Sequence, residues 1–148
     1  MSKEEINISI VNDLQSLRKI RNIMLRPEQP IETCIFPYDE VSIHLGLFLN
    51  QKLISIVSFS KQELDGYTHY NCWQFRGMAT LSKYSRLGYG KKLLKAAIKI
   101  IKDKDADFFW CNARESALNF YEKLNFEIIS DKFYVPISGP HYKMLLRL

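Results

Sequence analysis

The feature that most constrains this chain is the glycine turn Ser85-Arg86-Leu87-Gly88-Tyr89-Gly90-Lys91-Lys92. The residues just before it, 72–81, favour a β-strand, and apolar residues just after it recur at helical spacing. Glycines let the backbone approach a ligand closely, and the first amides of a helix lack partners within that helix. A strand, a glycine turn and a helix N-terminus together predict a site for a pyrophosphate group.

Two better-known phosphate loops do not fit this turn. The dinucleotide fingerprint needs a third glycine where the chain has Leu93, and a Walker loop needs glycine and a hydroxyl where the chain has Ser85 and Lys92. The turn alone fits a simple connection into a core helix equally well. Its assignment therefore depends on the rest of the chain.

Length and composition favour one domain over residues 1–148, because 47% hydrophobic and 25% charged residues are typical of a globular core and its surface. No apolar run reaches transmembrane length, and residues 1–5 lack the apolar region of a signal peptide, so we expect a cytoplasmic protein without membrane contact. Three scattered cysteines indicate free thiols in a reducing compartment, and three scattered histidines predict no metal site.

The chain carries a net charge of +5, and lysines gather between residues 91 and 104. They fit best a solvated helix face opposite the apolar stripe; the functional alternative is the attraction of a polyanionic cofactor to the start of that helix. A nucleic-acid partner is not expected, because no exposed aromatics are interleaved with the lysines and no helix-turn-helix pattern is present.

Hydrophobic periodicity and turn residues predict ten elements in the order β-α-β-β-β-α-β-α-β-β, with the last two strands separated by a turn at 136–140. Strands are expected at 6–10, 42–49, 52–60, 70–81, 107–111, 126–135 and 141–148, and helices at 13–25 (with Asn12 as N-cap), 89–103 and 115–124. The strand–helix–strand passage implies a parallel pair, and the hairpins imply antiparallel pairing. We therefore predict an α/β (α+β) fold, a mixed and mostly antiparallel sheet with a central parallel pair and helices on both faces.

With these elements in place, the sequence resembles the GNAT superfamily of acetyl-CoA-dependent N-acetyltransferases. The family's turn [RQ]-x-x-G-x-[GA] corresponds to 85–90, with Ser85 in place of Arg or Gln. A second family pattern, A-x-x-F-Y-x-K-x-G-F, corresponds to Ala117–Phe126, with Asn125 in place of glycine. Asparagine also tolerates the left-handed conformation expected at a helix end, so this departure is mild.

The resemblance implies that acetyl-CoA binds at the glycine turn and along the preceding strand. The positions that correspond to these cofactor contacts are Met78, Ala79, Thr80, Ser85, Arg86, Leu87, Gly88, Tyr89, Gly90, Lys91, Asn112 and Tyr121. Backbone of 78–80 would align the pantetheine and polarise the thioester carbonyl. Asn112 either hydrogen-bonds the pantetheine or caps the following turn.

The resemblance also makes Tyr121 the acid that protonates the leaving thiolate, against the alternative of a core aromatic. Some family members use a glutamate base at the position of Gln74, which cannot take a proton. His141 is the best remaining base, since imidazole titrates near neutral pH. A structural histidine, or water relays without a dedicated base, remain open.

Gln74 and Arg76 share a strand face, so they are predicted to line the acceptor pocket together with His141. There Arg76 would bind a carboxylate or phosphate of the acceptor, or else pair with an acidic side chain of the protein. The expected activity is acetyl transfer from acetyl-CoA to a primary amine of a small or amino-acid-like acceptor. The alternatives are a non-catalytic CoA sensor and, much less favoured, a nucleic-acid-binding domain. A homodimer is one of the assembly states that the resemblance leaves open.

Overall fold

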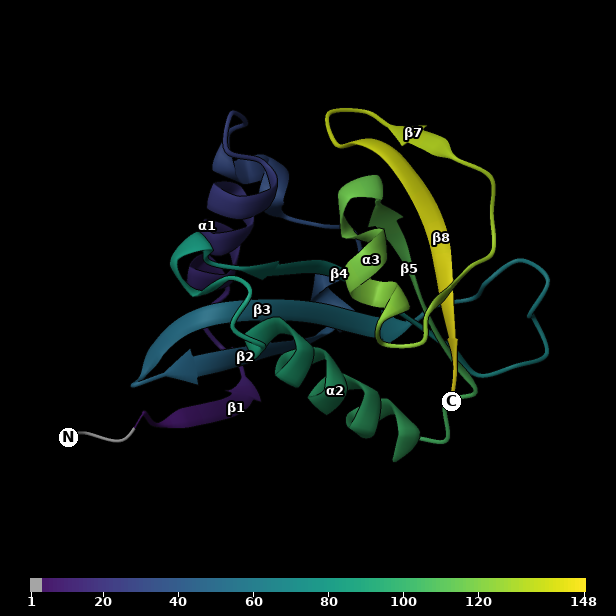
Figure 1. The fold of residues 1–148 in the computed structure, drawn as a ribbon, viewed down its shortest axis with the longest axis horizontal. Helices are drawn as coiled ribbons and strands as arrows, with labels where there is room; N and C mark the ends of the chain where they lie inside the picture. The colour runs from purple at the N-terminus through teal and green to yellow at the C-terminus, as the bar shows by residue number, and fades with distance from the viewer. Residues whose placement is uncertain (1–3) are drawn as a thin grey trace. The chain divides into compact units, whose positions relative to one another are not determined.

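Strands dominate the computed structural model, which describes residues 4–148 (Figure 1). The eight strands of that stretch are β1 (Ile6–Ile10), β2 (Ile43–Leu49), β3 (Lys52–Lys61), β4 (Cys72–Thr80), β5 (Phe108–Arg114), β6 (Glu127–Ile128), β7 (Phe133–Val135) and β8 (Gly139–Arg147). They pair in the order β1-β2-β3-β4-β5-β8-β6, and β7 also pairs with β8. The β4–β5 pair is parallel and the rest of the sheet mostly antiparallel, which confirms the predicted fold class.

The helices are α1 (Leu14–Leu25), α2 (Tyr89–Lys102) and α3 (Leu118–Glu122). Contacts divide the chain into two compact units: the residues up to Phe59 with Gly77–Ala97, and Ser60–Arg76 with Ile98–Leu148. The chain passes from one unit to the other within β3, β4 and α2. A single domain over residues 1–148 stays a prediction.

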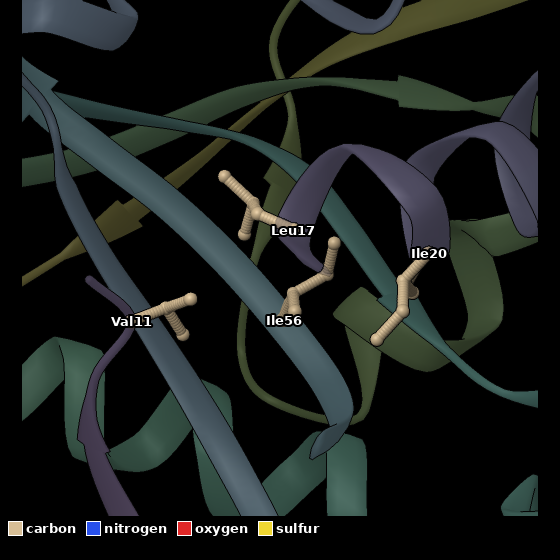
Figure 2. Packing of buried hydrophobic residues seen from close by; sticks show 5 residues of the cluster. Val11, Leu17, Ile20 and Ile56 are labelled. Atoms are coloured by element: carbon tan, nitrogen blue, oxygen red, sulfur yellow. The ribbon is translucent and has the colours of Figure 1, made fainter. Parts of the chain in front are cut away.

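In the first unit, α1 packs its apolar face on β3 and the end of β4. Leu17 and Ile20 of the helix lie with Val11, Ile56 and Ala79 in one buried cluster (Figure 2). Helix α1 begins one residue later than predicted, because Asp13 and not Asn12 is its N-cap. The Asp13 carboxylate accepts hydrogen bonds from the Ser16 hydroxyl and from the amides of Ser16 and Gln15. These hydrogen bonds, the one from the Ser16 hydroxyl most of all, lower the pKa of Asp13.

The predicted hairpin turn Asn50-Gln51 is confirmed between β2 and β3. Both residues have positive φ, 48° and 73°, as a two-residue turn of type I′ requires. Residues 26–42 form no strand and only two single 3₁₀ turns, Ile31–Cys34 and Asp39–Val41, close to the irregular segment that was predicted.

In the second unit, the strand expected at 107–111 extends three residues further, to Arg114. The expected helix 115–124 is instead a 3₁₀ turn, Glu115–Ala117, followed by the short α3. The strand expected at 126–135 is wrong as a single element: it is two short strands, β6 and β7, which pair separately with β8. The polar stretch Ser130-Asp131-Lys132 separates the two strands.

Helix α3 ends as the sequence predicted. Asn125 has φ 71°, its amide donates to the carbonyl of Glu122, and the amide of Phe126 donates to the carbonyl of Tyr121. These two bonds are those of a Schellman motif, in which asparagine replaces the usual glycine.

Across residues 4–148, none of the helices combines the length and apolar character needed to span a bilayer. Within the same residues, no three histidine, cysteine or acidic side chains gather in a group that could hold a metal ion. Cys34, Cys72 and Cys111 are free and buried.

Candidate active site

The glycine turn lies in the first unit, between the 3₁₀ turn Ser82–Tyr84 and the first residue of α2, Tyr89. Gly88 has φ 86°, a left-handed conformation that other residues rarely adopt. A Cβ built at Gly88 would meet no atom within 4 Å. Glycine is therefore needed here for its backbone angle, and the space beside it is open.

Free amides gather at the start of α2. The amide of Lys92 donates to the carbonyl of Gly88 at 3.1 Å, and this is the first turn of the helix. The amides that precede Lys92 have no carbonyl one turn earlier to accept them, and they lie at the positive end of the helix dipole. No acidic side chain occupies the first turn, and Lys91 and Lys92 are exposed beside it. This arrangement favours an anion.

Side chains of the turn differ in what they can offer a ligand. Ser85 already donates its hydroxyl hydrogen to the carbonyl of Ser82 at 2.8 Å. Tyr89 is buried, and its hydroxyl donates to Oε2 of Glu4 at 3.2 Å; burial first, and then the Glu4 charge, raises the pKa of this phenol. Arg86 and Leu87 are exposed. The turn thus presents backbone amides and the cations Arg86 and Lys91.

Met78, Ala79 and Thr80 form the end of β4 in the same unit. Ser55 of β3 holds this stretch: its hydroxyl lies 2.8 Å from the hydroxyl of Thr80 and 3.3 Å from the carbonyl of Ala79. The parallel register between β4 and β5 covers Cys72–Gln74, and in the described chain 78–80 takes no part in it.

In the second unit, the structure joins two of the predicted acceptor residues. Arg76 donates from Nη2 to Oε1 of Gln74 at 2.6 Å, and Gln74 is buried. The shared strand face is therefore confirmed by a direct contact. The Gln74 side chain therefore helps to orient the Arg76 guanidinium.

Tyr121 is fixed by aromatic packing in the second unit. Its ring centroid lies 5.4 Å from that of Phe75 and 5.8 Å from that of Phe126. Burial raises the pKa of its hydroxyl well above the usual value of a phenol; the neighbouring Cys111 adds to this, and the charge of Arg114 opposes it. The phenol therefore stays protonated at neutral pH.

His141 lies near the start of β8, as predicted, and it is buried. Its Nδ1 lies 2.8 Å from the carbonyl oxygen of Gly139. Because a carbonyl can only accept, the neutral ring carries its proton on Nδ1 and its lone pair on Nε2. Such a ring is set up to take a proton at Nε2.

Asn112 lies on the opposite face of β5 from its buried neighbours Cys111 and Ala113, and it is exposed. Its Oδ1 accepts a hydrogen bond from Nζ of Lys143 at 3.1 Å. The 3₁₀ turn after β5 has no side-chain cap, so the capping role considered for Asn112 is not observed.

Arg114 was missed by the sequence analysis. It is the cross-strand partner of His141, and its charge acts on the hydroxyl of Tyr121. Because the strand was predicted to end at Cys111, this arginine was assigned to a loop. The signal for it was the alternation of the strand, which continues through Ala113 and Arg114.

A model of the acetyltransferase (GNAT) family matches residues 12–126, more than half of the chain. The chain belongs to the GNAT family. The "Uncharacterized N-acetyltransferase YitI" of Bacillus subtilis strain 168 is a GNAT relative, 38% identical over 128 residues that cover 85% of this chain and 86% of the relative. The GNAT assignment makes the protein an acyltransferase and agrees with the resemblance of its two motifs.

Solved structures show the same GNAT fold. An aminoglycoside 6'-N-acetyltransferase in complex with coenzyme A has a TM-score of 0.75 and 14% identity, over 95% of this chain and 96% of the other. The NatC complex bound to Gag peptide and CoA has a TM-score of 0.79 and 18% identity, over 97% of this chain and 99% of the other. At these identities the likeness concerns the fold alone.

Proposed function

We propose that this GNAT protein transfers the acetyl group of acetyl-CoA to a primary amine by direct attack of the amine on the thioester. The observation that carries the proposal is the open glycine turn at the start of α2, in a chain whose family match spans 12–126. Two neighbours in fold are complexes with CoA, which supports the same donor here.

The donor would be held mainly by backbone. Amides at Gly88, Tyr89, Gly90 and Lys91 would bind the pyrophosphate, with Arg86 and Lys91 adding charge. The stretch 78–80 would align the pantetheine, and one of its amides would polarise the thioester carbonyl. Ser85, whose hydroxyl hydrogen is engaged by Ser82, would contribute only as an acceptor or through its backbone.

In the reaction, His141 would act as the base and Tyr121 as the acid. As the amine nitrogen attacks the carbonyl carbon and the C–N bond forms, Nε2 of His141 would take the proton that the amine loses. As the C–S bond breaks, the Tyr121 hydroxyl would donate its proton to the leaving thiolate. The products would be the acetylated amine and CoA with a free thiol, and the two side chains would exchange protons with solvent.

Arg76 supports an acceptor that carries an anionic group. Its guanidinium is oriented by Gln74, and a planar, permanently charged group binds a carboxylate or phosphate in two-pronged fashion. An amino-acid-like acceptor would supply both an anionic group for Arg76 to bind and an amine to attack the thioester.

The first experiment is calorimetric titration of the protein with acetyl-CoA and with CoA, beside the double variant Ser85→Glu/Gly90→Glu. We expect binding to the wild type and none to the variant, whose carboxylates would repel the pyrophosphate. Absence of binding by a folded wild type would contradict the proposal. CoA binding without turnover over a broad amine panel would instead favour a sensor.

A further inference from the structure

In the second unit, strand β8 pairs with β5 and with β7, and one side-chain face of these strands carries His141. Arg114 of β5 and Phe133 of β7 are its direct cross-strand partners. Side chains directly opposite each other on paired strands point to the same face, and so do residues two apart on one strand. Lys143, two residues beyond His141, and its partner Asn112 therefore share this face.

The ammonium group of Lys143 is held at a defined place on that face. Its Nζ donates to Oδ1 of Asn112 at 3.1 Å, and it lies 5.1 Å from the ring centroid of Trp110 and 5.4 Å from that of Phe133. At these distances the face of an aromatic ring attracts a cation. The ring centroid of His141 lies 5.9 Å from that of Phe133. One phenylalanine ring thus lies beside both the ammonium and the proposed base.

No carboxylate of the protein neutralises Lys143. Among residues 4–148, none of the ion pairs includes it. Glu127 shares the face as the cross-strand partner of Leu145, but no ion pair joins it to Lys143. An ammonium has three N–H donors, and Asn112 accepts from one of them. The half-buried lysine therefore presents donors and a full positive charge to a ligand.

Two arginines add positive charge to the same face. Arg114 does so by its position on β5, opposite the proposed base. Arg76 does so because Gln74, which accepts its hydrogen bond at 2.6 Å, is the register partner of Trp110. Side chains of one sign gathered in this way favour a ligand with more than one negative charge. A single carboxylate bound by Arg76 would leave the lysine ammonium uncompensated.

We infer that Lys143 binds a second anionic group of the acceptor, so that the acceptor is a primary amine with two anionic groups. An amino acid with an acidic or phosphorylated side chain has this chemistry. The inference rests on the proposed acetyl transfer, in which Arg76 binds one anionic group and His141 takes the proton of the amine. Lys143 is then a specificity-determining residue for the second group.

The test compares amino acids that differ in the charge of the side chain: L-glutamate with L-glutamine, and O-phospho-L-serine with L-serine. The kcat/KM of each is measured with acetyl-CoA for the wild type and for Lys143→Met, which removes the charge and keeps a long apolar side chain. We expect the wild type to favour the charged member of at least one pair about ten- to hundredfold, as a charge-assisted hydrogen bond permits. The pair that shows the preference distinguishes a carboxylate from a phosphate.

The variants separate ligand binding from packing and from net charge. Lys143→Met should lose the preference, and Lys143→Arg, which keeps a cation beside the two rings, should retain most of it. Lys102→Met removes an exposed lysine of the same unit and should retain all of it. Because the preference is a ratio of two kcat/KM values for one protein, a smaller fraction of folded protein does not change it. Acetyl-CoA affinity should be the same in all variants.

Three results would overturn the inference while leaving the donor site intact, provided that acetyl-CoA still binds. The first is a wild type that acetylates the neutral member of each pair as well as the charged one. The second is a wild type that acetylates none of the four amino acids. The third is a preference that survives Lys143→Met. Failure of the wild type to bind acetyl-CoA would remove the proposed function as well.

Discussion

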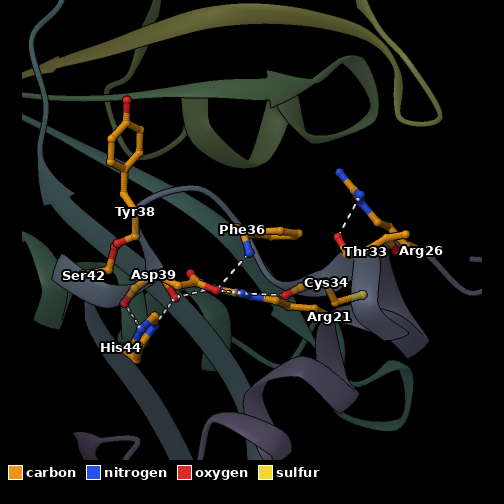
Figure 3. Close-up of polar contacts among 10 residues, drawn as sticks. Arg21, Arg26, Thr33, Cys34, Phe36, Tyr38, Asp39, Ser42 and His44 are labelled. Carbon is orange, nitrogen blue, oxygen red and sulfur yellow. Dashed lines mark hydrogen bonds and ion pairs between the residues drawn. The ribbon is translucent and has the colours of Figure 1, made fainter. Parts of the chain in front are cut away.

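Arg21 and Asp39 face each other in a two-pronged ion pair whose side chains are 0% and 7% exposed. Burial alone would raise the pKa of Asp39, but hydrogen bonds from Arg21 and the Phe36 amide, with the Arg21 charge, lower it below its ordinary value. The pair also holds residues 34–39 in place, because Arg21 donates to the carbonyl of Cys34 and Asp39 accepts from the amide of Phe36 (Figure 3).

Asp39→Asn should destabilise the protein by about 3–5 kcal/mol, because it leaves the buried Arg21 charge without its partner. The pKa of Asp39 is depressed in the folded state, so its contribution is present above the unfolded pKa near 4 and is lost as pH falls through the folded pKa. Urea unfolding of the wild type and of Asp39→Asn, at neutral pH and below pH 4, measures this difference in unfolding free energy. Equal losses at both pH values would contradict the role of the ion pair; Glu40→Gln, an exposed neighbour, is the control.

Gly88→Ala should weaken acetyl-CoA binding, because a side chain at φ 86° strains the turn and moves the amides of α2. Gly66→Ala is a matched control: Gly66 has φ 87°, and its Cβ would likewise meet nothing within 4 Å. Each change should cost about 1–2 kcal/mol of stability. Titration with acetyl-CoA should show loss only for Gly88→Ala, and equal affinity in both variants would argue against the turn as the donor site.

Tyr121→Phe should lower kcat by about 10²–10⁴-fold while leaving acetyl-CoA affinity and Tm nearly unchanged, since the ring contacts with Phe75 and Phe126 remain. Steady-state kinetics and calorimetry on one preparation measure both effects. Tyr134→Phe, at a side chain that is 74% exposed, is the control. Full activity of Tyr121→Phe would show that the tyrosine is only a core aromatic.

His141→Gln should lower kcat/KM by about 10²–10⁴-fold, because glutamine cannot take the amine's proton. Binding of acetyl-CoA should be unaffected. His69→Gln changes an exposed histidine and should leave kcat/KM intact. Unaltered kcat/KM in His141→Gln would favour water relays over a dedicated base.

The elements that sequence predicted best are those with long-range regularity. The hairpin at Asn50-Gln51 and the parallel pair of β4 with β5 follow from turn residues and from a strand–helix–strand passage. The split of residues 126–135 was missed because two- and three-residue strands leave almost no periodic signal. Asn12 and Asp13 are both good N-cap residues, and in the structure it is Asp13 that caps α1.

The candidate site was also only partly predictable from the sequence. Gly88 could be identified because a glycine in a turn indicates a backbone angle that few residues tolerate. Arg76 and Gln74 could be placed together because strand alternation puts them on one face. The Arg21–Asp39–Ser58 cluster was invisible, because its members are 18 and 37 residues apart from Arg21 and follow no motif. The sequence signal for this cluster was Arg21, which lies beside the apolar positions Leu17 and Ile20 of α1.

Because α1 anchors residues 34–39, the side chains that hold the backbone of this segment differ from those that are exposed to solvent. Inward groups such as Arg21 and Asp39 fix the backbone, while the side chains of Ile35 and Val41 are exposed and take no part in those hydrogen bonds. Substitutions at Ile35 and Val41 should therefore leave the backbone of the segment in place. Related proteins can vary at such positions at small cost in folding.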